Sequence, residues 1–308
     1  LYGYAYTIYN LFLSLSTVGI PPAMSKLISE YNALKYYNTK ERAYKLGKYL
    51  LIGLGIILFF IMFFGAPFIA NQIMGDNTGG NSKESITFVI RIISTAILVV
   101  PYLSVTKGYL QGHKFMAPPS ISQVIEQLVR IAVILIGSYL CVRVLNLGVT
   151  NAVGIAVFGA TLGALAALIY LLVNIKKNKK DIIRTDDKKE EEKKITNKQI
   201  IKNLLIYSVP FISFGLALSV YDYIDMTTII DGLTNLGFKT SDAESVLGVI
   251  NTTGNKLNSV VLAISTGLMT SLVPNITSSF VKKNYKDVKR KVNQSFLMLL
   301  YVTMPMAV

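Results

Sequence analysis

Cysteine and histidine are nearly absent from this sequence of 308 residues, which contains one of each and no tryptophan. Cys141 alone cannot form an internal disulfide, and it cannot join His113 in a Cys/His metal cluster or nucleophilic pair. The nucleotide-binding loop GxxxxGK followed by Ser or Thr is missing as well. We therefore expect no catalytic residue, no metal site and no resident cofactor.

Charge is also missing from long stretches of the chain. Residues 49–75 and 144–175 hold no Asp, Glu, Lys or Arg, and a bilayer core of roughly 30 Å needs about 20 mostly apolar residues per helix. Helix is the expected element, because a chain in lipid must satisfy its backbone hydrogen bonds internally. The pattern predicts eight spans, at approximately 5–30, 46–75, 85–112, 118–142, 149–175, 200–229, 244–280 and 293 to beyond 308.

The basic residues are sorted between alternate loops. The loops at 31–48, 111–118, 176–202 and 281–291 hold 23 of the 31 Lys and Arg residues, whereas the opposite loops hold only three. This positive-inside pattern assigns the basic loops to the cytoplasm. Topology and anionic lipid headgroups then account for the net charge of +14, so we expect membrane lipids as partners and no nucleic acid.

A mixed-charge segment at 176–198 has almost nothing apolar to bury and divides the predicted bundle. We expect an N-terminal transmembrane lobe at 1–175, a charged cytoplasmic linker at 176–198 and the start of a C-terminal transmembrane lobe at 199–308. A faint repeat between the stretches beginning at Leu13 and Leu262 suggests that the two lobes have like topology. The chain opens without Met or a basic signal-peptide region and stops in an apolar run, so we expect a fragment that lacks the first helix.

Five basic residues fall inside the predicted spans, where a cation costs several kcal/mol unless it faces water, a partner or a ligand. For Lys26, Lys107 and Arg91, extension of the side chain to the membrane interface is an alternative. Lys256 is deep in its span beside Asn255 and is expected to line a polar cavity. The five are Lys26, Arg91, Lys107, Arg130 and Lys256.

The string QVIEQLVRI at 123–131 predicts a polar stripe on an otherwise apolar helix, formed by Gln123, Gln127 and Arg130. Glu126 adjoins this stripe and is four residues from Arg130, so the two can pair. The pair is either a structural bridge between helices or a device that shields Arg130 in a hydrated cavity. Because intramembrane bases outnumber acids, an anionic cargo is favoured, and phosphate or pyrophosphate suits convergent Lys and Arg groups.

Three strings resemble a known family: GIPPAMSKLISE at 19–30, KGYLQGHKFMAPPSISQVIEQLVRI at 107–131 and SVPFI at 208–212. On these strings the sequence resembles the multidrug/oligosaccharidyl-lipid/polysaccharide (MOP) superfamily, in particular its polysaccharide-biosynthesis and stage V sporulation protein B-like branch, and is similar to MurJ-type lipid II flippases. The resemblance implies an all-α polytopic membrane helix bundle with two pseudo-symmetric lobes around a central cavity, here a fragment of a transporter of about 14 helices. It also implies a bacterial cytoplasmic membrane location.

The resemblance and the polarity pattern together predict a substrate-binding cavity. Lys26 matches a basic residue of the corresponding flippase helix, whereas Arg130 and Lys256 are placed by helix and polarity alone. The predicted cavity residues are Lys26, Arg130, Lys256, Glu126, Gln127 and Asn255, with Lys107 and Arg91 as further candidates.

The expected function is that of a monomeric flippase for an undecaprenyl-pyrophosphate-linked precursor, such as lipid II or another lipid-linked oligosaccharide. It would work by alternating access, driven by H⁺, Na⁺ or the membrane potential, where each charge crossing is worth about 2.3 kcal/mol per 100 mV. The alternatives are a drug or cation antiporter of the same superfamily, which needs cavity acids, and a non-transporting scaffold in cell-wall or spore assembly. An intramembrane glycosyl- or phosphotransferase would need clustered acids or a histidine at the membrane face.

Overall fold

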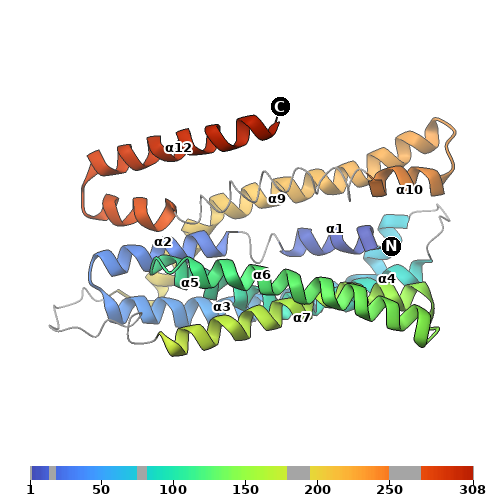
Figure 1. Ribbon diagram of the computed structural model, residues 1–308, viewed down its shortest axis with the longest axis horizontal. Helices are drawn as coiled ribbons and strands as arrows, with labels where there is room; N and C mark the ends of the chain where they lie inside the picture. Colours follow the sequence, from blue (N-terminus) through green and yellow to red (C-terminus); the bar gives the residue numbers. More distant parts are fainter. Residues whose placement is uncertain (1, 14–18, 75–81, 179–194, 250–271, 308) are drawn as a thin grey trace.

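The computed structural model describes residues 2–13, 19–74, 82–178, 195–249 and 272–307. Every regular element within these ranges is helical (Figure 1), which confirms the all-α fold class. Lys256 and Asn255 lie outside the described residues, as do most of the span predicted at 244–280 and the first part of the repeat copy that begins at Leu262.

The helices before residue 178 pack as one bundle. They are α1 (Tyr2–Leu13), α2 (Ile20–Ala33), α3 (Tyr37–Met74), α4 (Lys83–Ser94), α5 (Ala96–Gly112), α6 (Ala117–Ala132), the π-helical segments η2 (Val133–Gly137) and η3 (Leu140–Val144), and α7 (Gly148–Lys177). The later helices are α9 (Asn197–Asn235), α10 (Thr240–Val249), the short apolar helix Leu272–Val281 and α12 (Tyr285–Ala307).

Several of these helices have the length and composition of membrane spans. Exposed apolar side chains such as Phe64, Leu128 and Phe214, at 68%, 62% and 68% exposure, cover their outer faces. Such a surface suits hydrocarbon as the surrounding solvent, since lipid imposes no penalty on exposed apolar groups. The spans are Tyr37–Gln72, Lys83–Gly112, Ala117–Val144, Gly148–Lys177 and Asn197–Asp222.

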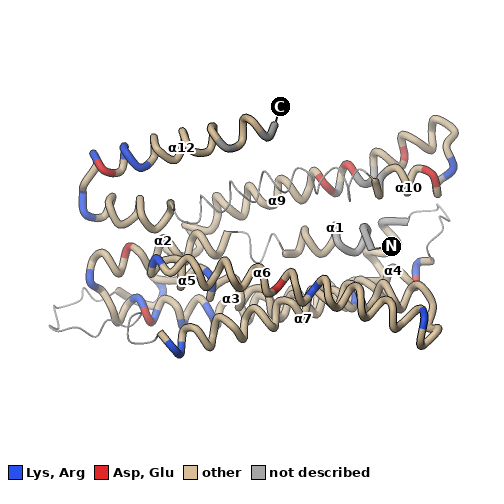
Figure 2. The backbone as a smooth tube through the Cα atoms, in the orientation of Figure 1, with Lys and Arg blue, Asp and Glu red and all other residues tan. Residues whose placement is uncertain are grey.

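One end of the molecule carries most of the positive charge, as Figure 2 shows at the left. At this basic end α2, α5 and the helix Leu272–Val281 finish, and α3, α6, α9 and α12 begin. The helices therefore alternate in direction as the loop charges predict. By the positive-inside rule, the basic end is the one expected to face the cytoplasm.

The prediction of a loop at 31–48 is wrong for most of these residues. The chain turns only at 34–36, and α3 begins at Tyr37 and continues without a break to Met74. Hydropathy marks the part of a helix that lies in lipid, whereas its polar first turns leave the membrane as helix. This extension positions Arg42 to donate hydrogen bonds to the Ile195 carbonyl at 2.9 Å and the Asn197 side chain at 2.7 Å.

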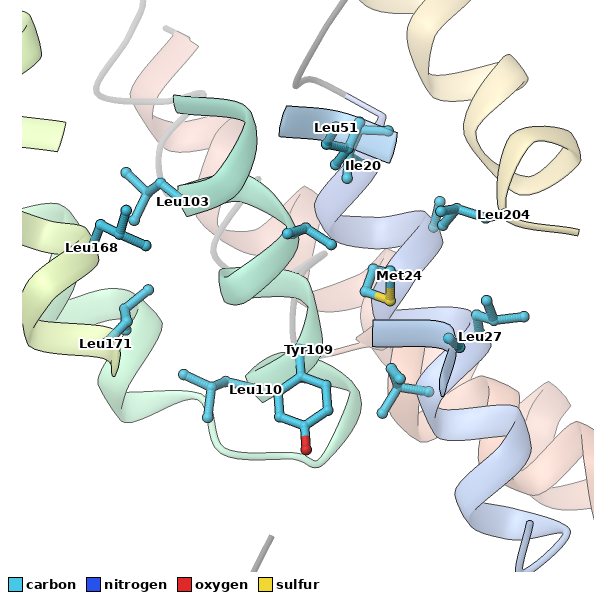
Figure 3. Close-up of a cluster of buried hydrophobic side chains, with 14 of the residues drawn as sticks. Ile20, Met24, Leu27, Leu51, Leu103, Tyr109, Leu110, Leu168, Leu171 and Leu204 are labelled. Carbon is cyan, nitrogen blue, oxygen red and sulfur yellow. The ribbon is translucent and has the colours of Figure 1, made fainter. Parts of the chain in front are cut away.

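The core at the basic end joins α9 to the preceding helices. Figure 3 shows Met24 and Leu27 of α2 beside Leu204 of α9, in the same cluster as Tyr109 of α5 and Leu171 of α7. All five side chains are buried. Apolar contact thus fixes α9 against α2, and it positions the polar groups on the same two helices.

Candidate functional site

Lys26 lies where α2 meets α9. Its ammonium nitrogen is 3.7 Å from the centroid of the Tyr207 ring, a cation–π contact. The Tyr207 hydroxyl donates a hydrogen bond to Glu30 Oε2 at 3.0 Å, and Glu30 is one helical turn beyond Lys26. The aromatic side chain therefore connects a cation and a carboxylate on α2 to α9.

The two helices approach closely because Gly19 has no side chain. A Cβ there would lie 2.7 Å from the Ser208 carbonyl oxygen and 2.7 Å from Ile212 Cγ1, too close for any real side chain. Nearer the basic end, the Ser29 hydroxyl donates to the Pro274 carbonyl at 2.8 Å. We call Gly19, Lys26, Glu30 and Tyr207 the α2–α9 junction.

A second group of charges lies between α5 and α6. Glu126 accepts from Lys107 at 3.1 Å and from Arg130 at 3.2 Å, and the three side chains are only 13%, 13% and 15% exposed. We call these residues the charged triad. The predicted Glu126–Arg130 pair is present, and one carboxylate serves two cations, so the triad retains one unit of positive charge.

The packing around the triad is tight. Gly163 of α7 faces the backbone of Glu126, where a Cβ would lie 2.5 Å from the Glu126 carbonyl oxygen. Lys107 was not predicted as a partner of Glu126. It lies on α5, across the turn at 113–116 and 19 residues away in the chain, so spacing along one helix could not reveal the contact.

The other predicted site residues are not gathered with these groups. Gln127 is exposed on α6. Arg91 is exposed near the end of α4, where its Nε donates to the Phe63 carbonyl at 3.4 Å and its guanidinium lies over the Phe63 ring. Lys26 and Lys107 are partly buried, and each contacts a partner inside the bundle. Within the described residues, no group of three or more His, Cys, Asp and Glu could hold a metal ion.

The sequence model of the polysaccharide biosynthesis protein family matches residues 1–280. The chain is 33% identical over 309 residues to the lipid II flippase MurJ of Bacillus subtilis (strain 168), covering 100% of the chain and 57% of the relative. It is 27% identical over 302 residues to the stage V sporulation protein B of the same organism, covering 97% and 55%. The chain thus spans little more than half the length of these curated relatives.

Solved structures of low sequence identity share the fold. One is a multidrug resistance MATE family transporter of the MOP superfamily in an outward-facing conformation, at 12% identity and a TM-score of 0.62 over 99% of this chain and 61% of that one. Another is a MOP superfamily transporter from Pyrococcus furiosus, at 13% identity and a TM-score of 0.63 over the same shares. These likenesses support the fold class predicted from the sequence.

Proposed function

We propose that this chain, which belongs to the polysaccharide biosynthesis protein family, is the core of a multi-pass bacterial membrane flippase for a lipid-linked cell-wall or polysaccharide precursor. The cargo would be of the lipid II type, with an undecaprenyl-pyrophosphate anchor. The observation that carries the proposal is the 33% identity to a lipid II flippase along the whole chain.

The positive charge inside the bundle supports an anionic cargo. The charged triad has two cations and one carboxylate within the membrane, and Lys26 sits at a contact between helices that a lobe movement would open. When α2 and α9 separate, Lys26 loses the Tyr207 ring and becomes free to bind pyrophosphate. Convergent ammonium and guanidinium groups suit that ligand, and water in the opened site would hydrate the sugar head.

The driving force and the cavity residues outside the structure are part of the same proposal. Lys256 and Asn255 would contribute from the predicted C-terminal lobe, and H⁺, Na⁺ or the membrane potential would bias the cycle. We propose that a single copy of the protein is the working unit. The cation-antiporter alternative is less favoured, because Glu126, the acid it requires, is already held by two cations.

Complementation of a flippase-depleted strain tests the proposal. Lys26→Ala, Arg130→Ala and Lys256→Ala should each abolish rescue while the protein remains inserted in the membrane. Lys45→Ala is the matched control, because Lys45 is an exposed lysine on the polar first turns of α3, and it should rescue fully. Full rescue by all three cavity variants would reject an anionic cargo and favour a scaffold.

A further inference from the structure

A pocket of about 660 Å³ opens at the basic end, between the turns that follow α2 and α5 and the C-terminal end of the helix Leu272–Val281. None of its ten lining residues is acidic. Its ionisable and hydroxyl-bearing lining includes Lys35, Lys114, Lys282, His113, Ser29 and Ser278. We call this the basic-end pocket. It draws on both predicted lobes, and it is separate from the charged triad.

Lysine occupies backbone positions at the pocket where glycine would be less strained. Lys35 and Lys114 line the pocket with φ angles of 61° and 66°, and Lys283, beside it, has a φ of 57°. Each follows the end of a helix, a position where glycine adopts the left-handed conformation without strain. Helix C-termini attract cations in general. A lysine at any position in the last turn would meet that attraction, so it does not explain why the lysine occupies the strained position.

The lysines at the pocket repel one another. Partial burial lowers the pKa of the Lys114 ammonium, and the charges of Lys291 and Lys282 lower it further. Lys291 forms an ion pair with Asp287 at 2.6 Å. The Asp287 carboxylate is therefore already paired with a lysine outside the pocket lining. An anion in the pocket would relieve this repulsion.

His113 adds a hydrogen-bonding group with an unused atom. Its Nδ1 is 2.8 Å from the Tyr109 carbonyl oxygen. Since a carbonyl only accepts, Nδ1 carries the proton and Nε2 holds a lone pair. Nε2 is buried and has no partner among the described residues. The His113 ring lines the same pocket as Lys35, Lys114 and Lys282, so it lies beside the position where these lysines would hold anionic oxygens.

We propose that the basic-end pocket binds the phosphate or pyrophosphate group of an anionic ligand. The pocket is large enough for a hydrated pyrophosphate, its lining is cationic, and Ser278 and His113 add neutral polar side chains. The site goes beyond the transport proposal, because its lining at the basic end shares no residue with the α2–α9 junction or the charged triad.

The test is isothermal titration of inorganic pyrophosphate into the full chain held in phosphatidylcholine nanodiscs. The wild type should bind one pyrophosphate, and Lys114→Gly and Lys282→Ala should each weaken binding at least tenfold. Lys114→Gly also relieves the backbone strain at that position, so its loss of binding cannot be ascribed to misfolding.

The matched control is Lys283→Gly, which removes the same charge from the same backbone conformation one residue outside the pocket. It should bind within twofold of the wild type. Absence of binding by the wild type overturns the proposal. So does an equal loss in Lys283→Gly, because that result would mean diffuse attraction to the basic end and no defined site.

A second arm distinguishes a lipid headgroup from a soluble phosphate. Replacing half of the phosphatidylcholine with anionic phosphatidylglycerol should weaken pyrophosphate binding if a lipid phosphate occupies the pocket, and this competition should disappear in Lys282→Ala. Unchanged binding assigns the site to a soluble phosphate. Because neither arm measures transport, failure of the flippase proposal would leave this result standing.

Discussion

At the scale of single residues, the charged triad illustrates how ionised groups persist between membrane helices. A lone cation in hydrocarbon costs several kcal/mol, and a carboxylate within hydrogen-bonding distance recovers much of that cost. Glu126 does this for Lys107 and Arg130 together. Removing the shared carboxylate should therefore cost more than removing either cation, because two like charges would remain close to each other.

Glu126→Gln should lower the free energy of unfolding by about 3 kcal/mol, the range found when one partner of a buried pair is removed. Thermal unfolding in detergent measures the change. Gln127→Ala is the control, because Gln127 is the exposed neighbour and its loss should cost under about 0.5 kcal/mol. Adding Lys107→Met to Glu126→Gln should restore part of the loss, and a result without any restoration would contradict the shared-carboxylate interpretation.

His113 makes stability depend on pH. Burial, and secondarily the charge of Lys40, lowers its pKa from 6.5 to about 4. Between these values the unfolded chain binds more protons than the folded one, so stability should fall as pH drops from about 6.5 toward 4, by at most about 1.4 kcal/mol per pH unit.

The comparison is between melting temperatures at pH 7 and pH 5. His113→Asn keeps a side-chain donor for the Tyr109 carbonyl and removes the titrating ring, so its melting temperature should fall less than that of the wild type. Equal decreases in the two proteins would mean that other groups control the acid sensitivity.

At the scale of helices, the α2–α9 junction depends on an absent side chain. Gly19→Ala forces a methyl group against the Ser208 carbonyl and Ile212, and should destabilise the protein by about 1–3 kcal/mol, as overpacking does elsewhere. Gly53→Ala in α3 meets open space, so it should stabilise by about 0.5–1 kcal/mol through helix propensity. Melting temperatures that shift in the same direction for both variants would refute the close-contact explanation.

Helix prediction from the sequence succeeded for element type and for the spans, but it did not reveal interruptions within them. The apolar run at 85–112 was predicted as one span, and Lys83–Gly112 has the length and composition of one, with a break between α4 and α5 at Thr95. The Thr95 hydroxyl lies 2.7 Å from the Ile92 carbonyl oxygen and 2.7 Å from the Thr161 hydroxyl of α7. Because Thr161 is distant in sequence, no local pattern could reveal that contact.

The site was predictable to a similar extent. Spacing along one helix gave the Glu126–Arg130 pair, since four residues make about one turn. Tyr207 was missed, because its contact with Lys26 depends on how α9 crosses α2. The basic-end pocket was missed as well, because its lysines and His113 had been assigned to separate loops. Contacts within an element are therefore readable from sequence, whereas contacts between distant elements require the fold.

At the scale of the whole molecule, the basic end predicts the orientation in the membrane. In a Cys141→Ser background, Lys239→Cys should react with a membrane-impermeant maleimide in intact cells, because Lys239 is exposed at the opposite end. Lys198→Cys, exposed at the start of α9 on the basic end, should react only in inverted vesicles. The reverse labelling pattern would require the opposite topology.

The close contact between Gly19 and α9 is a point about which α2 could tilt. Ten residues of α2 separate Gly19 from Ser29, a lever arm of about 15 Å at 1.5 Å per residue. A swing of about 10° around this pivot would carry Ser29 through about 2.6 Å, enough to break its 2.8 Å hydrogen bond to the Pro274 carbonyl. A small tilt at Gly19 would thereby be amplified into detachment of α2 from the helix Leu272–Val281 at the basic end.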